Sequence, residues 1–100
     1  METLRIDRYV MESLMPDIVG HDKKPAAFVV YLYLWGRLAR TRSKKIPASY
    51  QTIADETGLS KSAAQASIRH LMRRRLIRCE LASKTATPVY CVLRPWRRAA

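Results

Sequence analysis

The sequence is short of cysteine and glycine and has no long apolar run. Its two cysteines are too few for a disulfide framework. Its longest apolar stretch, residues 25–35, is about half of the ~20 residues that a membrane-spanning helix needs. Glu2 and Asp7 interrupt any basic-then-apolar leader at the N-terminus. Because 48% of the residues are apolar, the chain can still form a folded core. We therefore expect a soluble cytoplasmic domain with no membrane partner.

Residue clusters that carry catalysis or bind metals are also missing from the sequence. No group of His, Cys and Asp has metal-ligand spacing, no glycine-rich phosphate loop is present, and the two histidines are isolated. We therefore expect that the chain is not an enzyme, has no catalytic residue, and binds neither a metal nor a cofactor.

Positive charge is abundant and unevenly distributed. The chain has 19 Lys and Arg against 8 Asp and Glu, a net charge of +11. Residues 1–22 carry two basic and five acidic side chains, a net −3, whereas residues 23–100 carry 17 basic and three acidic ones, a net +14. This asymmetry predicts an acidic N-terminal arm over residues 1–22 and a basic domain over residues 23–98. A domain this basic attracts polyanions, of which nucleic acid and anionic membrane surfaces are the common ones.

The arm and the segment that follows it carry most of the apolar residues in the N-terminal half. Apolar residues of the arm recur at roughly helical spacing, but Pro16 should break or kink a single helix, and an extended stretch around Tyr9 and Val10 is the alternative. A helix is predicted over residues 26–40, with Asp22 as a cap. Its first half is apolar on all sides, so either the arm or a second copy must cover it. We expect a homodimer through helix 26–40 with help from the arm.

Two short helices separated by a glycine turn follow. Ser49 is a good N-cap for a helix over residues 50–57, and Gly58 ends that helix. Ser60 caps a helix over residues 61–74, whose inward positions are Ala64, Ser67, Ile68, Leu71 and Met72.

A β-hairpin is predicted after these helices. The segments 77–81 and 89–93 are rich in β-branched and aromatic residues, and the loop 82–88 separates them. Ile46–Pro47 is predicted as a short extended link. A hairpin centred on Thr85 would place Cys79 opposite Cys91, where a disulfide would be strained, and the redox state of the two cysteines stays open.

These elements resemble the winged helix-turn-helix family. The stretch Ser49 to Ser62 reads Ser-Tyr-Gln-Thr-Ile-Ala-Asp-Glu-Thr-Gly-Leu-Ser-Lys-Ser and is similar to the family pattern Ser-x-x-x-Ile-Ala-x-x-x-Gly-Leu-Ser-x-Ser. Ile68-x-x-Leu71, Leu76-Ile77 and the hairpin continue the resemblance over residues 25–93. It implies a mainly α fold with a small β-hairpin, a three-helix core plus a wing. The sequence departs from the family pattern at two places. Arg75 stands where the family usually has glycine, and Ala63–Ala64 stand where it usually has Thr-Val.

The resemblance implies that helix 61–74 reads the major groove of DNA. The side chains expected to contact base edges are Lys61, Ser62, Gln65, Ala66 and Arg69. Those expected to contact the DNA backbone are Ser49, Tyr50, Thr52, Ser60, Arg73, Lys84 and Thr85. His70 lies beside this face and is expected to be partly buried.

The expected function is sequence-specific binding of double-stranded DNA by a bacterial or phage transcription regulator associated with the nucleoid. Two alternatives stay open. One is a DNA-binding module of a replication-initiation or plasmid-maintenance protein. The other is a winged-helix module that binds protein or RNA.

Overall fold

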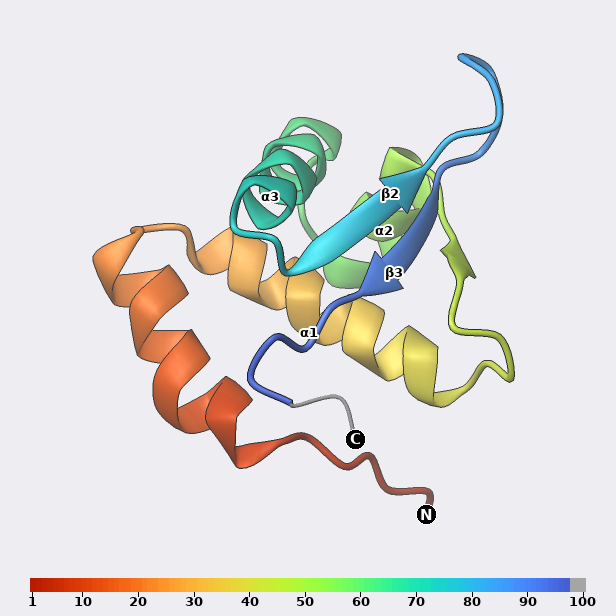
Figure 1. Ribbon diagram of the computed structural model, residues 1–100. Helices are drawn as coiled ribbons and strands as arrows, with labels where there is room; N and C mark the ends of the chain where they lie inside the picture. Colours follow the sequence, from red (N-terminus) through yellow and green to blue (C-terminus); the bar gives the residue numbers. More distant parts are fainter. Residues whose placement is uncertain (98–100) are drawn as a thin grey trace.

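Helices form most of the described part of the chain, residues 1–97 of a computed structural model (Figure 1). Two short π-helical segments and three α helices accompany a sheet of three short strands. In chain order they are η1 (Val10–Leu14), η2 (Pro16–His21), α1 (Pro25–Ala39), β1 (Ile46–Pro47), α2 (Tyr50–Thr57), α3 (Lys61–Arg73), β2 (Ile77–Glu80) and β3 (Val89–Val92). The predicted mainly helical class with a small antiparallel sheet is confirmed. Arg98, the last residue of the predicted basic domain, lies outside the described residues.

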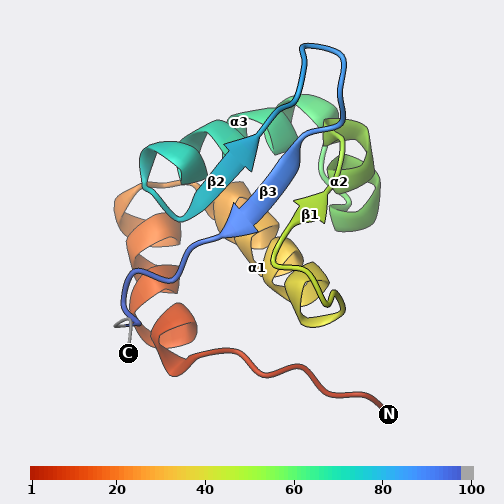
Figure 2. The same cartoon turned by 45° about the vertical axis from the view of Figure 1, so that its right-hand side comes forward.

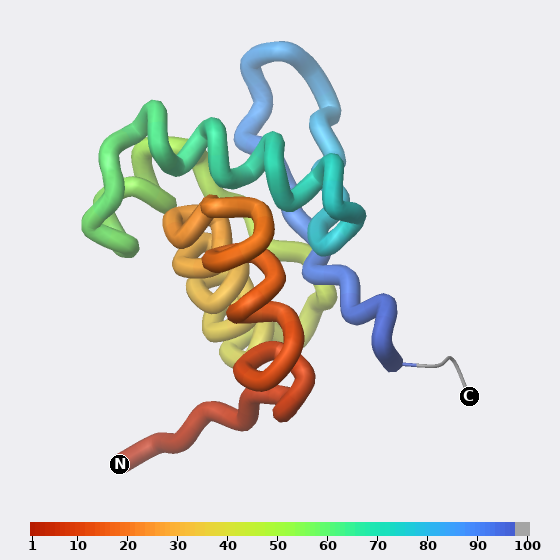
Figure 3. The backbone as a smooth tube through the Cα atoms, turned by 90° about the vertical axis from the view of Figure 1, so that its left-hand side faces the viewer, coloured from red at the N-terminus to blue at the C-terminus, as the bar shows by residue number. Residues whose placement is uncertain are grey.

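The arm covers α1 within the same chain. Val10, Leu14 and Ile18 recur every four residues and are each at most 4% exposed in a core that they share with α1. Figure 3 shows the arm running beside α1. The apolar residues of α1 are therefore no argument for a second copy, and the homodimer through helix 26–40 stays a prediction. No helix within residues 1–97 is long and apolar enough to cross a membrane.

The helical spacing of the arm's apolar residues indicated its structure, and the expected break at Pro16 was wrong. The chain is helical from Arg8 onward, so the extended alternative around Tyr9 fails. Pro16 does not break the helix: Met15 before it keeps helical dihedrals (φ −58°, ψ −56°), and Pro16 is the first residue of η2. The helical run continues over residues 8–21 although Pro16 has no N–H to donate.

Asp22 does not cap α1, as the sequence suggested. The N-cap is Lys24, which makes no side-chain cap hydrogen bond, and Asp22 instead turns toward α3. Asp22 thus contacts His70, 48 positions away, instead of capping the helix next to it.

The C-terminal tail fastens the arm. Trp96 stacks on Tyr9 with ring centroids 4.7 Å apart and lies 6.3 Å from the ring of Trp35 on α1. Its indole N–H donates to Asp7 Oδ2 at 2.8 Å. Arg97 donates to both carboxylate oxygens of Asp7, at 2.7 and 2.6 Å. Residues 7–9 of the arm and residues 96–97 thus meet over α1, a contact that the sequence did not predict.

The sheet has one strand more than the predicted hairpin. Its order is β1-β3-β2, all antiparallel, and β1 is the Ile46–Pro47 segment that was predicted as a link. Cys79 pairs with Tyr90, and Cys91 pairs with Arg78, so the predicted Cys79–Cys91 pairing is wrong by one residue. Because side chains alternate along a strand, this shift puts the two cysteines on opposite faces of the sheet, and both are free thiols.

The end of α3 differs slightly from its prediction. The helix ends at Arg73, and Met72, expected inward, is 43% exposed. Arg75 takes the left-handed conformation (φ 56°) that turns the chain into β2, at the position where the family resemblance leads one to expect glycine.

We expect Arg75→Gly to raise the free energy of unfolding by about 0.5–1 kcal/mol. A side chain in the left-handed region costs about 1–2 kcal/mol, and the greater freedom of glycine in the unfolded chain offsets part of the gain. Urea denaturation measures the change. As a control, Arg69→Gly at an exposed position inside α3 should lower stability by about 1 kcal/mol. Equal losses in both variants would mean that Arg75 makes contacts worth more than the strain.

We expect Asp7→Asn to weaken the fastening of the arm in a pH-dependent way. Hydrogen bonds from Arg97 and Trp96 lower the pKa of Asp7 from 3.8 to about 2. A lowered folded-state pKa stabilises the fold above about pH 4, and this stabilisation is lost as the pH falls toward 2.

Circular dichroism melts over a pH series measure this effect. Asp7→Asn should melt at a lower temperature than the parent at neutral pH and should lose less of its stability between about pH 4 and pH 2. Glu12→Gln, at an exposed position of the arm, should keep the parent's profile. An identical profile for Asp7→Asn would contradict the role given to Asp7.

Candidate nucleic-acid interface

The turn between α2 and α3 is fixed by short local hydrogen bonds. Ser49 Oγ accepts the backbone N–H of Thr52 at 3.1 Å and begins α2. Gly58 ends α2 in the left-handed conformation (φ 80°). Ser60 Oγ accepts the N–H of Ala63 at 3.1 Å and begins α3. All three were predicted from the sequence, and together they set the direction in which α3 leaves the turn.

One face of α3 is buried and the other is polar, basic and open. Ala64, Ser67, Ile68 and Leu71 are buried, so they anchor the helix on the core. The predicted base-contacting residues lie on the other face: Lys61, Ser62, Ala66 and Arg69 are exposed, and Gln65 is half-buried. Gln65 and Arg69 lie one helical turn apart, and Arg73 continues their row at the helix end. Within residues 1–97, none of the three basic residues on this face forms an ion pair.

The predicted backbone-contacting residues are spread over α2, α3 and the hairpin loop. Ser60 is exposed at the start of α3, and Lys84 and Thr85 are exposed on the β2–β3 loop, which projects past α2 and α3 in Figure 2. At the start of α2, Ser49 and Thr52 are half-buried, and their hydroxyls hydrogen-bond to each other at 3.0 Å. Tyr50 is half-buried against the core. Ser60 and the two loop residues are therefore open to a ligand. The three residues at the start of α2 are partly buried and already make contacts within the fold.

Sequence reasoning missed two lysines beside α3. Lys23 and Lys24 lie at the turn between the arm and α1, and with Ala63 and Ala66 they line a cleft of about 240 Å³. This turn lies close to α3 in Figure 3. The only local signal was their place just before Pro25 at the start of α1. Their proximity to α3 depends on the packing of α1 against α3, which sequence periodicity does not report.

The acidic arm binds the C-terminal half of α3. Asp22 Oδ2 lies 2.8 Å from His70 Nε2 and 3.2 Å from Arg74 Nε. Asp17 also pairs with Arg74. The hydrogen bond from His21, followed by that from His70, lowers the pKa of Asp22, although burial opposes the shift. The side chain of His70 is 14% exposed, so the prediction that it is partly buried is confirmed.

Three side chains of the arm meet in a way that the sequence spacing did not predict. One ligand atom each of Asp17, His21 and Asp22 lies within 4.8 Å of the others. Both carboxylates, however, already pair with Arg74, whose fixed positive charge occupies the place next to them. The cluster is therefore explained as part of the contact between the arm and α3.

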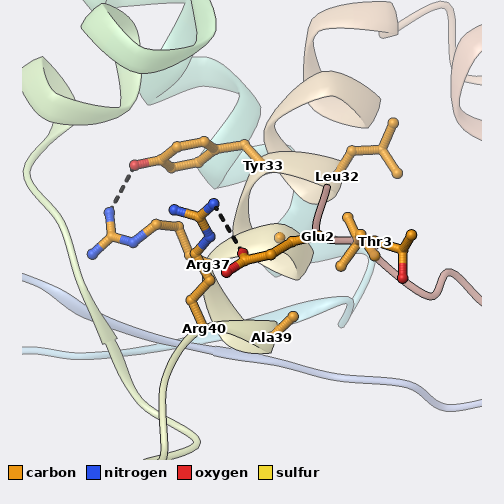
Figure 4. A pocket seen from close by; sticks show the side chains of 9 residues that line it. Glu2, Thr3, Leu32, Tyr33, Arg37, Ala39 and Arg40 are labelled. Carbon is orange, nitrogen blue, oxygen red and sulfur yellow. Dashed lines mark hydrogen bonds and ion pairs between the residues drawn. The ribbon is translucent and has the colours of Figure 1, made fainter.

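A groove of about 450 Å³ separates residues 2–4 from α1 (Figure 4). Its charged side chains are satisfied by neighbours. Arg37 donates to the hydroxyl of Tyr33 at 2.8 Å, that hydroxyl donates to Glu56 at 2.5 Å, and Arg40 pairs with Glu2 at 3.7 Å. Because these charges cancel, the groove differs from the exposed face of α3, whose charges are not matched.

Comparisons with known proteins add no further constraint. No protein-family model, no curated protein and no solved structure matches the chain. A function therefore has to be inferred from the residues described above.

Proposed function

We propose that this chain is a winged helix-turn-helix protein that binds double-stranded DNA and acts as a transcription regulator. In this proposal α3 is the recognition helix and the β2–β3 loop is the wing. One observation carries the proposal: α3 is anchored by one face and presents on the other an open row of basic and polar side chains, whose basic members form no ion pair within residues 1–97. A helix of this kind fits the major groove of B-DNA.

The open row has side chains suited to base edges. Gln65 can hydrogen-bond both N6 and N7 of adenine, and Arg69 or Lys61 can bind O6 and N7 of guanine. Ala66 offers a methyl group to thymine, and Ser62 can donate to or accept from several bases. These contacts give the protein a sequence preference.

Basic side chains on both sides of the row are suited to phosphates. Lys23 and Lys24 flank α3 on the side of the arm, and Lys84 extends from the loop. Arg73 lies at the end of the helix, and the capped N-terminus of α3 favours an anion near Ser60. Phosphate contacts hold the duplex in register without reading its sequence.

We expect duplex binding to weaken steeply with salt. Neutralising about four or five phosphates gives a slope of about −4 in a plot of log K against log salt concentration. Fluorescence anisotropy with a random-sequence duplex over a salt series measures this slope. A flat response, or equal affinity for double-stranded RNA, would contradict the proposal and favour the protein- or RNA-binding alternative.

We expect mutations to distinguish residues that contact bases from residues that contact phosphates. Gln65→Ala or Arg69→Ala should cost about 1–3 kcal/mol on a preferred duplex obtained by selection and change affinity for random duplex little. Lys84→Ala should weaken both by a similar factor and reduce the magnitude of the salt slope by about one.

Arg8→Ala is the matched control, because Arg8 is 90% exposed on the arm, away from α3. Its affinity for both duplexes should equal that of the parent. If Lys84→Ala alone abolished sequence preference, the loop would read the bases and α3 would not be the recognition helix.

A further inference from the structure

A second basic surface lies outside the proposed interface. Two adjoining grooves, of about 310 and 530 Å³, share Lys44 and Arg94 in their walls. Arg5 and Arg42 line the first groove, and Arg78 lines the second. We call these five residues the tail-side basic surface.

The five positive charges come from separate parts of the chain. Arg5 precedes the arm helix, Arg42 and Lys44 follow α1, Arg78 is on β2, and Arg94 follows β3. Arg97 also lines both grooves, but it pairs with Asp7. Among the residues that the structure describes, no acidic side chain lines either groove, and none of the five cations forms an ion pair. Folding therefore brings like charges together at a cost that a bound polyanion would relieve.

Parts of this surface are held in place by the tryptophan cluster of the core. The guanidinium carbon of Arg94 lies 5.7 Å from the centre of the Trp35 ring, within the range of a cation–π contact. The indole N–H of Trp35 donates to the backbone carbonyl of Arg5 at 2.8 Å. Arg94 and the backbone of Arg5 are thus positioned before any ligand arrives, which lowers the entropy lost on binding.

The tail-side basic surface and the hairpin loop of the proposed interface lie at opposite ends of the sheet. Arg78 is next to the Ile77–Val92 pair at the open end of the β2–β3 hairpin, whereas Lys84 is on the loop at its other end. Figures 1 and 2 both show the segment after α1 and the tail after β3 far from this loop. Duplex DNA is stiff over about 150 base pairs, so a short duplex lying on α3 and the hairpin loop does not bend around the molecule to the tail.

We infer that the tail-side basic surface binds the phosphate backbone of a second DNA duplex, so that one chain bridges two duplexes. The inference rests on the proposed function only in the choice of duplex DNA as the polyanion. A duplex fits the charge pattern because its backbone is a continuous line of phosphates and demands no apolar anchor. A membrane surface would be favoured by protruding large apolar side chains. The large apolar residues lining these grooves, such as Leu38 and Val92, are half-buried or buried, and of the apolar lining residues only the small Ala39 is exposed.

A two-duplex capture experiment tests the inference on the full chain. One short random-sequence duplex is fixed to beads, a second fluorescent duplex of the same sequence is free, and the protein-dependent retention of fluorescence is measured. Anisotropy on a single duplex and sedimentation velocity are recorded for the same samples. Arg42→Glu is compared with Arg8→Glu, which makes the same charge change at an exposed position of the arm.

We expect the parent and Arg8→Glu to retain the second duplex and Arg42→Glu to retain roughly fivefold less. The single-duplex affinity of Arg42→Glu should equal that of Arg8→Glu, and both should sediment like the parent. The inference fails if the parent binds one duplex without retaining a second, or if the two variants retain equally. It also fails if Arg42→Glu changes the sedimenting species, since a dimer would then be the bridge.

Two other outcomes would reassign the surface. If the parent binds no duplex in the anisotropy measurement, the proposed function fails, whatever the capture shows. If Arg42→Glu abolishes binding to phosphatidylserine vesicles while no second duplex is retained, the surface binds lipid headgroups instead of DNA.

Discussion

The burial of α1 is the constraint on which the other elements depend. Val30, Tyr31 and Leu34 of this helix are fully buried, and the Tyr31 hydroxyl donates to the carbonyl of Leu93 at 2.9 Å. The arm packs on one side of α1, while α3 and β3 contact it elsewhere. Trp96 then fastens the arm from the outside. Because α3 is oriented by its contact with α1, any change that uncovers α1 also disturbs the face that α3 presents.

The distribution of charge follows from this arrangement. Asp7 pairs with Arg97 and holds the arm to the tail. Asp17 pairs with Arg74 and Asp22 with His70, and these contacts hold the arm to the end of α3. The acidic arm therefore neutralises Arg97 and Arg74, whereas the other cations of the two basic surfaces form no ion pair within residues 1–97. This accounts for a sequence whose negative charge is concentrated in its first 22 residues and whose positive charge remains accessible elsewhere.

Local features were predictable from the sequence, and distant contacts were not. The caps at Ser49 and Ser60, the turn at Gly58 and the open face of α3 follow from spacings of a few residues, and the structure has all of them. The contacts of Asp22 with His70 and of Asp7 with Trp96 join residues 48 and 89 positions apart. Periodicity carries no information on such pairs. The same limit explains why β1, the register of Cys79 and Cys91, and the position of Lys23 and Lys24 beside α3 were missed.

The claim that α3 meets duplex DNA is tested most directly by nuclear magnetic resonance. A short duplex is titrated into the isotope-labelled chain, and the shifts of the backbone amides are followed over the first equivalent. The account predicts the largest shifts from Ser60 to Arg69, with smaller ones at Lys23, Lys24 and the β2–β3 loop. Largest shifts confined to the outer face of α1, around Tyr33 and Arg40, with α3 unaffected, would contradict it.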